Sequence, residues 1–335
     1  MIQLTRYTIV DKLHEGSETV IYRAIRDADQ QPVVIKTPRS EYPTPRALAN
    51  LQHEYSLLRA LELPGVIKAL ALESRGSSLA LVLEDFGGQS LSKLAAQQPL
   101  GIETILQIAI AVADTLAILH SQPIVHKDIK PHNILYNPRT GQVKLIDFCL
   151  ATRLSSFSAL GAHALEGSLA YMAPEQTGRM NRVVDPRSDL YSLGATLYEL
   201  LTGVLPFQAT DSMAMIHSHI ARRTVPPSQR SPSIPQILSD LVMKLLAKAA
   251  EDRYQSASGL KADLQECLQQ WQARREIAQF ALGRSDIGGA LRLPQRLYGR
   301  QEATSALLAA LDRTSAGAAE LLLLTGPAGV GKSAL

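Results

Sequence analysis

The stretch "IVHKDIKPHNIL", residues 124–135, sets a group of polar side chains between two apolar ends. His126, Asp128, Lys130 and Asn133 all stand in it, a few positions apart. A surface loop can hold such a mixture by chance. The stretch therefore indicates a reaction site only if the rest of the chain supplies further groups for one reaction.

Composition excludes several classes of protein. The chain has 335 residues, 46% hydrophobic and 19% charged, which is typical of a globular protein long enough for two domains. Its 34 basic and 31 acidic residues do not indicate a nucleic-acid partner. The two cysteines, Cys149 and Cys267, lack disulfide-framework or zinc spacing.

The sequence gives no sign of export or of a membrane segment. The N-terminal "MIQLTRYTIVDKLHEG" lacks the apolar core of a signal peptide. No apolar run approaches the roughly 20 residues that span a bilayer. We therefore expect a cytoplasmic protein without a membrane segment in this chain.

The first part of the chain is expected to form a small lobe rich in strands. "YTIVDKLHEG" and "TVIYRAI" alternate around Gly16, "PVVIK" is a β-branched run, and "LALVLEDFGG" is a further apolar strand. Between the last two, Leu48, Leu51, Tyr55 and Leu58 recur at helical spacing, and Pro64–Gly65 ends that helix.

A larger helical lobe is expected to follow. Apolar residues recur at three- and four-residue steps in four places, which predicts four helices. These stripes are Ile105, Ile108, Val112, Leu116 and Leu119; Leu190, Leu193, Leu197 and Leu200; Ile237, Leu241 and Leu245; and Leu260, Leu264 and Leu268.

Past Trp271 the character of the sequence changes. Residues 270–295 are charged, then rich in glycine, and are interrupted by Pro294, as a linker would be. The remaining residues, 296–335, are too few to bury a core of their own. We therefore expect the chain to be the front part of a longer polypeptide.

Several polar residues fit the requirements of phosphoryl transfer, which depends mainly on positioning and charge neutralisation. Lys36, at the end of a strand, could reach nucleotide phosphates. Glu54, in the middle of a helix, could pair with that lysine and fix its direction.

The opening stretch supplies the remaining groups. Asp128 could accept the proton of an attacking hydroxyl, and Lys130 could steady the transferred phosphate. Asn133 and Asp147 offer hard oxygen ligands suited to Mg²⁺.

Taken together, these motifs resemble the eukaryotic-type protein kinase family over residues 7–269. The resemblance rests on "VVIK" (33–36), "HKDIKPHN" (126–133), "DFC" (147–149), "YMAPE" (171–175) and "SDLYSLGATLYELLTG" (188–203). It implies an α+β, two-lobed kinase fold, with a small β-rich N-lobe, a larger helical C-lobe and ATP in the cleft between them.

The resemblance also implies roles for residues. Asp128 would be the catalytic base, with Lys130 and Asn133 beside it, and Asn133 and Asp147 would hold Mg²⁺. Leu83 would line the back of the ATP pocket, next to a hinge at residues 84–86. The implied ATP-binding residues are Leu13, Gly16, Ile21, Lys36, Glu54, Glu84, Phe86 and Asp147.

Further positions match the family pattern. Lys130 and Ser168 resemble the branch that phosphorylates serine and threonine. Glu175 and Arg253 match a buried ion pair of the large lobe. Asp189 matches the helix residue that holds the catalytic loop from below.

Three features depart from the pattern. Only Gly16 remains of three glycines in the phosphate-covering loop, since His14 and Thr19 occupy the other places. Lys127 replaces an arginine that in the family commonly binds a phosphate on the activation loop. We therefore expect activation without phosphorylation of that loop. Cys149 replaces the glycine of "DFG", which is expected to restrain the pivot of that motif. We interpret Cys149 as a small buried hydrophobe rather than a redox sensor.

Serines in the expected activation segment, Ser155, Ser156 and Ser158, are candidates for phosphorylation, although serine-rich loops are commonly only loops.

A second phosphate-binding motif lies at residues 326–333. "GPAGVGKS" matches the P-loop pattern and follows the apolar run "ELLLLT", which predicts a strand. Gly326 and Gly331 would let backbone N–H groups cradle phosphates, with Lys332 on the β- and γ-phosphates and Ser333 on Mg²⁺. Residues 296–335 resemble the first part of an α/β P-loop ATPase domain of the AAA/STAND group. Without an acidic strand, the site is incomplete.

A kinase domain joined to such an ATPase resembles large bacterial multi-sensor signalling kinases, which implies C-terminal signalling modules as partners. The leading hypothesis is an ATP- and Mg²⁺-dependent serine/threonine protein kinase. The alternative is a catalytically weak or inactive ATP-binding pseudokinase with a regulatory or docking role. Transfer to a small molecule is the third hypothesis, and "YMAPE" favours a protein substrate over it.

Overall fold

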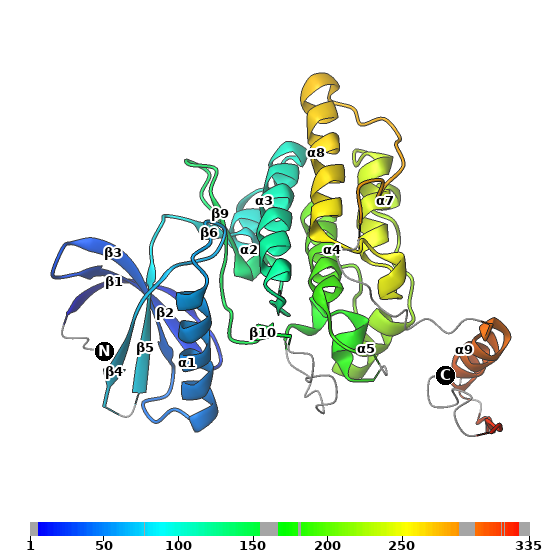
Figure 1. Cartoon of the computed structure of the whole chain (residues 1–335), viewed down its shortest axis with the longest axis horizontal. Helices are drawn as coiled ribbons and strands as arrows, with labels where there is room; N and C mark the ends of the chain where they lie inside the picture. Colours follow the sequence, from blue (N-terminus) through cyan, green and yellow to red (C-terminus); the bar gives the residue numbers. More distant parts are fainter. Residues whose placement is uncertain are drawn as a thin grey trace.

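The computed structural model describes residues 6–76, 78–154, 167–179, 182–287, 299–315, 317 and 319–327. A sheet-rich lobe is followed along the chain by a larger helical lobe, with α9 (Gln301–Ser315) beyond it (Figure 1). The expectation of an α+β, two-lobed architecture is confirmed.

An antiparallel five-stranded sheet forms the small lobe, in the order β1-β2-β3-β5-β4. Its strands are β1 (Tyr7–Glu15), β2 (Thr19–Arg26), β3 (Gln31–Pro38), β4 (Ala69–Arg75) and β5 (Ser78–Glu84). Four of these strands were predicted. Strand β4 was not predicted, and its register with β5 shifts between Ala69 and Ala71.

Alternation along β3 explains how the sheet presents Lys36. Val33 and Ile35 are fully buried with Ala80 and Val82 on one face of the sheet. Since successive side chains of a strand point to opposite faces, Lys36 lies on the other face. Lys36 thereby reaches Glu54 of helix α1 (Pro45–Ala60).

Helix α1 begins where local signals place it. The Thr44 side chain accepts a hydrogen bond from the backbone N–H of Ala47, and a proline stands at the first helical position. The helix buries Leu51, Glu54 and Leu58. A buried glutamate on this face needs a charged partner, which makes it a functional candidate.

The loop after α1 fastens the small lobe to the large one. The backbone carbonyl of Gly65 accepts from the backbone N–H of Leu145, and the Leu145 carbonyl accepts from Ile67. A Cβ on Gly65 would lie 1.9 Å from Oγ1 of Thr115, so only glycine permits this close approach.

Helix α4 (Pro186–Thr202) is the centre of the large lobe, since most of its residues are buried. The other helices of this lobe are α2 (Leu91–Gln97), α3 (Ile102–Ser121), α5 (Ser212–Ile220), α6 (Pro227–Arg230), α7 (Gln236–Leu245) and α8 (Ala257–Arg274). The short strands are β6 (Gln89–Ser90), β7 (Ile124–Val125), β8 (Ile134–Tyr136), β9 (Val143–Leu145) and β10 (Thr152–Arg153). Single 3₁₀ turns are η1 (Pro131–Asn133), η2 (Leu169–Tyr171), η3 (Pro174–Thr177) and η4 (Ala250–Asp252). The four predicted helices correspond to α3, α4, α7 and α8.

Helix α3 bears on the expectation that this chain has no membrane segment. Within the described ranges it is the one helix long and apolar enough to cross a bilayer by length and composition. Half of that stretch is buried in the large lobe, where α3 packs against α8 and α4. That is the environment of a core helix.

The segment after α8 returns along the large lobe (Figure 1). Ile277, Phe280 and Leu282 pack against the main core, and the backbone N–H of Gly283 donates to Asp263. The Asp286 carboxylate accepts from the backbone N–H groups of Gln255 and Ser256, at 2.6 and 2.8 Å. We call residues 276–287 the return segment.

The strand predicted at "ELLLLT" is wrong for the described residues 319–327, which adopt no regular secondary structure. Leu321 is 94% and Leu323 82% exposed. A lone strand leaves its backbone N–H and C=O groups without partners, and among the residues the structure describes no other strand pairs with this run.

Candidate active site

Three charged groups meet between the lobes. Nζ of Lys36 lies 2.7 Å from Oε2 of Glu54 and 2.7 Å from Oδ1 of Asp147. Burial lowers the pKa of Lys36, but the charges of Glu54 and Asp147 outweigh it, so the pKa is raised above its usual value. The lysine is therefore held as a cation between two carboxylates.

The pKa values of the two carboxylates that pair with Lys36 are shifted in opposite directions. Burial raises the pKa of Glu54, and the charge of Lys36 only partly offsets this. For Asp147, burial also raises the pKa, but Lys36 prevails and holds it well below its ordinary value. Asp147 is thus the more firmly ionised carboxylate, as a cation ligand must be.

The second oxygen of Glu54 reaches the chain next to Asp147. Oε1 of Glu54 accepts a hydrogen bond from the backbone N–H of Phe148, at 3.1 Å. The Phe148 ring is fully buried and meets His126 edge-on, with ring centroids 4.6 Å apart. One helix residue, Glu54, therefore fixes both Lys36 and the backbone that carries Asp147.

Residues 124–135 are anchored by Asp189 of α4. Asp189, which is fully buried, accepts from the backbone N–H groups of His126 (2.9 Å) and Lys127 (2.8 Å) and is 2.9 Å from Nε2 of His120. Lys127 has a φ of 69°, in the left-handed region. A backbone that is uncommon for a side-chain-bearing residue needs such anchors.

Asp128 is surrounded by donors. Its Oδ2 accepts from Nζ of Lys130 (2.6 Å) and from Nδ2 of Asn133 (2.9 Å). Its Oδ1 accepts from the backbone N–H of Ser168, at 3.1 Å. Lys130 also donates to the Ser168 hydroxyl at 2.6 Å, so the lysine joins the loop to the segment before "YMAPE".

The residues expected to bind Mg²⁺ suit that ion. The amide nitrogen of Asn133 is committed to Asp128, which leaves the amide oxygen for a cation. Asp147 presents a carboxylate whose side chain is 30% exposed. Carboxylate and amide oxygens are hard ligands, and Mg²⁺ combines few protein ligands with substrate phosphates and water.

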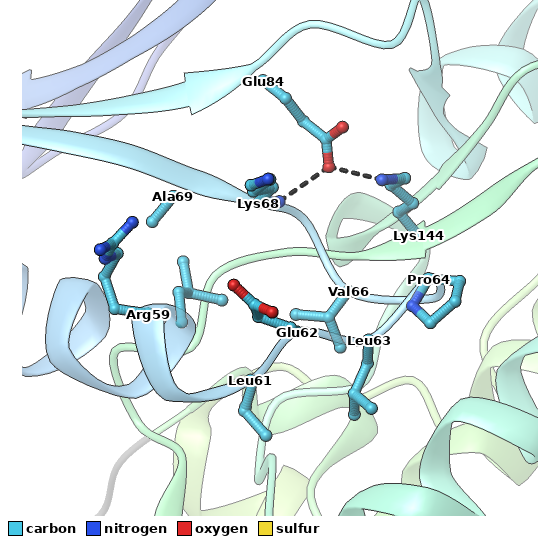
Figure 2. A pocket seen from close by; sticks show the side chains of 11 residues that line it. Arg59, Leu61, Glu62, Leu63, Pro64, Val66, Lys68, Ala69, Glu84 and Lys144 are labelled. Atoms are coloured by element: carbon cyan, nitrogen blue, oxygen red, sulfur yellow. Dashed lines mark hydrogen bonds and ion pairs between the residues drawn. The ribbon is translucent and has the colours of Figure 1, made fainter.

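The expected hinge follows β5 directly. The carboxylate of Glu84 accepts from Nζ of Lys144 and from the backbone N–H of Lys68 (Figure 2). A contact between Glu84 and a nucleotide would therefore come from its main chain. Asp85 is fixed by Arg23 of β2, and the Phe86 carbonyl accepts from Asn137 at 2.7 Å. The hinge is thus tied to both lobes.

The comparisons with known proteins agree with this geometry. Residues 7–269 match the protein kinase domain family, and residues 296–335 match the AAA ATPase domain family.

The chain belongs to the protein kinase family.

Its kinase relatives are bacterial and eukaryotic. A probable serine/threonine-protein kinase of Clostridium perfringens is 31% identical over 262 residues, which are 78% of this chain and 38% of that protein. Serine/threonine-protein kinase PrkC of Bacillus subtilis is 30% identical over 261 residues, 77% of this chain and 40% of that protein. The hybrid signal transduction histidine kinase G of Dictyostelium discoideum is 38% identical over 185 residues, 49% of this chain and 5% of that protein. The chain spans less than half the length of each of these relatives.

Two residues expected to lie over the nucleotide, Leu13 and Ile21, are on β1 and β2. Leu13 lies on β1 and is 37% exposed, and Ile21 lies on β2, paired in register with His14. The backbone N–H of Gly16 donates to the Thr19 carbonyl at 2.9 Å, which closes the turn between the strands. These residues line the edge expected to cover the phosphates.

Cys149 of the kinase "DFC" motif is partly buried. Burial, followed by the charge of Asp147, raises the pKa of the Cys149 thiol above its usual value. Since the thiolate is the reactive form, this environment favours an inert thiol.

The large lobe contains the ion pair that the resemblance implies. Arg253 donates from its two terminal nitrogens to the two oxygens of Glu175, at 2.7 and 2.9 Å, and both residues are buried. Arg253 also donates to the carbonyls of Ala247, Arg187 and Lys248.

Sequence reasoning missed three contacts of the site. His53 of α1 contacts the carbonyl of Ala151, Lys144 pairs with Glu84, and Arg23 pairs with Asp85. Each joins segments that lie far apart in the sequence. Only the position of Lys144, three residues before Asp147, hinted at a role near the site.

The second phosphate motif is only partly visible. Gly326 belongs to the irregular stretch 319–327, while Gly331, Lys332 and Ser333 lie outside the described residues, as do Ser155, Ser156 and Ser158.

Proposed function

We propose that this chain transfers the γ-phosphoryl group of ATP to a serine or threonine hydroxyl of a protein. The observation that carries the proposal is the convergence of Lys36, Glu54 and Asp147 at 2.7 Å contacts beside the donor-surrounded Asp128. Membership of the protein kinase family and the names of the relatives support it.

Each side chain has a distinct part in the proposed transfer. Lys36 would bind the nucleotide phosphates, with its direction fixed by Glu54. Asp128 would accept a hydrogen bond from the substrate hydroxyl and orient its oxygen in line with the γ-phosphorus. Lys130, beside Asp128, would neutralise charge on the transferred group.

Asn133 and Asp147 would hold Mg²⁺ through their oxygens. The ion, when bound with ATP, would supply neutralisation of phosphate charge. The adenine would meet the hinge at the main chain of Glu84 and Phe86, with Leu13 and Ile21 above it and Gly16 near the phosphates.

A protein substrate suits this arrangement better than a small molecule. Lys130 contacts Ser168, which begins the segment leading into "YMAPE", so the acceptor position lies next to that segment. Its residues Leu169–Tyr171 form η2, which packs against α4 and α5. Such a platform can bind an extended peptide beside Asp128.

We further propose that activity does not require phosphorylation of the activation segment. Lys127 stands where an arginine would form bidentate contacts with a phosphate, and lysine is a poorer partner for such contacts. The site residues already meet in the chain as it stands. Full activity after phosphatase treatment is the expected result, and loss of activity would refute this part.

A pseudokinase with a regulatory or docking role is the second candidate. It is favoured by His14 and Thr19 in place of glycines and by Cys149 beside Asp147. Against it, the five residues needed for catalysis are all present: Lys36, Glu54, Asp128, Asn133 and Asp147.

We assign the kinase domain to residues 7–269, a linker to 270–295 and the beginning of a P-loop ATPase domain to 296–335. C-terminal signalling modules would be its partners in a longer polypeptide. Because the proposed reaction uses ATP, we assign the chain to the cytoplasm. Nucleic acid is not among the proposed partners.

The test is phosphate transfer from labelled Mg-ATP to the chain itself and to a generic basic protein. Asp128→Asn is the matched variant, because it keeps the size of the side chain and removes the carboxylate. Loss of a positioned base is expected to lower the rate by about 10²- to 10⁴-fold.

Labelled phosphoserine or phosphothreonine with the wild type, and its loss in Asp128→Asn, would support the kinase. If neither protein transfers phosphate while both bind Mg-ATP, the pseudokinase hypothesis is favoured. Transfer to small hydroxyl compounds but not to protein would favour the third hypothesis.

A further inference from the structure

Two neighbouring side chains of α1 reach the same segment of the large lobe. Oε1 of Glu54 accepts from the backbone N–H of Phe148 at 3.1 Å. One residue earlier, Nε2 of His53 lies 2.7 Å from the backbone carbonyl oxygen of Ala151. The helix therefore holds the chain on both sides of Cys149 and Leu150.

The backbone between these points needs support. Asp147 has a φ of 65°, in the left-handed region that side-chain-bearing residues seldom adopt. Such a conformation persists only where the surroundings impose it. Lys36 and Glu54 hold Asp147 and Phe148, at the beginning of the segment.

Ala151 is the point at which the segment passes from α1 to the large lobe. Directly after it, β10 pairs with β7, and the backbone N–H of Leu154 donates to the Pro123 carbonyl at 2.7 Å. The contact with His53 thus lies between the anchors on Asp147 and Phe148 and those on β7.

We propose that His53 is a positioning residue that fastens the segment 147–151 to α1 and keeps Asp147 in place for the nucleotide-bound cation. The inference rests on the proposed function, since it concerns the same site. His53 stands outside the protein kinase motifs. It would act through Asp147 and would not contact the reacting atoms.

The acceptor determines the chemistry of the contact. A carbonyl oxygen carries no hydrogen, so the imidazole must donate from Nε2. Glutamine can supply an N–H in its place, whereas leucine of similar size cannot. The contact also needs no added phosphate, which fits activation without phosphorylation.

The expected size of the effect follows from one hydrogen bond. Its loss changes the ratio of held to released segment by roughly two- to tenfold. If only the held form binds Mg-ATP, the apparent dissociation constant rises as the held fraction falls. The ATP affinity, rather than the melting temperature, is therefore the informative measurement.

The experiment compares His53→Leu, His53→Gln and wild type in the whole chain of 335 residues. Gln52→Leu is the matched control, because Gln52 is an exposed neighbour on the same helix. Hydrogen exchange of residues 147–154 and calorimetric binding of Mg-ATP are measured, and neither needs phosphate transfer.

We expect His53→Leu to speed exchange in residues 147–154 and to weaken Mg-ATP binding by up to about tenfold, the limit reached when the released form predominates. Glutamine should restore both, and the control should change neither. Unchanged exchange and affinity in His53→Leu would overturn the proposal, as would equal loss in the leucine and glutamine variants. Since binding and exchange are read without catalysis, an inactive chain would refute the proposed function and leave this result interpretable.

Discussion

Replacing Arg253 by methionine should destabilise the large lobe strongly. The guanidinium is fully buried, pairs with Glu175 through two nitrogens and donates to three backbone carbonyls. Methionine of similar length would leave the Glu175 carboxylate with the Ser188 hydroxyl as its remaining partner in the structure. Removing one member of a buried ion pair costs about 3–5 kcal/mol.

For a domain of this size, such a loss lowers the melting temperature by about 6–20 °C. The free energy of unfolding can be measured by urea titration, followed by the fluorescence of Trp271, the single tryptophan, which lies in α8. A double variant, Glu175→Leu with Arg253→Met, removes both charges. It should cost less than the sum of the two single variants, because neither charge is then left buried alone.

Lys12→Met is the control, since Lys12 and Glu15 form an exposed pair on β1. That variant should leave the urea midpoint unchanged. A loss below about 1 kcal/mol in Arg253→Met, or strict additivity in the double variant, would refute the reasoning.

Three further predictions concern other parts of the chain. Asp189→Asn should lower kcat by about tenfold to a hundredfold with ATP affinity nearly unchanged, because the loop carrying Asp128 loses its anchor; steady-state kinetics with an unaltered kcat would contradict this. Asp286→Ala should lower the free energy of unfolding by about 1–2 kcal/mol through loss of its hydrogen bonds to Gln255 and Ser256 just before α8, whereas Glu276→Ala, in the same segment, should not. Burial, and next the charge of Lys248, lower the pKa of His219 to about 4. The unfolded chain therefore binds that proton more readily, so stability should fall between pH 6.5 and 4, and urea titrations of His219→Asn should show a shallower fall.

Much of the fold could be predicted because the decisive signals are local. The strands around Gly16, the helix through Leu51 and Leu58, and the stripes of α3 and α4 follow directly from periodicity. The order of Lys36, Glu54 and the opening stretch predicted phosphoryl transfer chemistry, and the resemblance to protein kinases predicted its place between two lobes. The structure brings Lys36, Glu54 and Asp147 together, and the chemistry stays a prediction.

The remaining features depend on pairs that no local pattern connects. Glu84 and Lys144 lie 60 positions apart, and His53 and Ala151 lie 98 apart. Only the folded chain brings them together. Leu321–Leu324 shows the opposite failure, because an apolar run indicates a strand but becomes one only beside a partner strand.

The return segment decides where the chain leaves the large lobe. Helix α8 has 18 residues and is therefore about 27 Å long, and the segment travels back over that length to Asp286, beside the residues that begin the helix. The first residues of α8 and the end of the return segment therefore lie side by side. The chain leaves the large lobe next to Gln255, whose side chain accepts from Arg187.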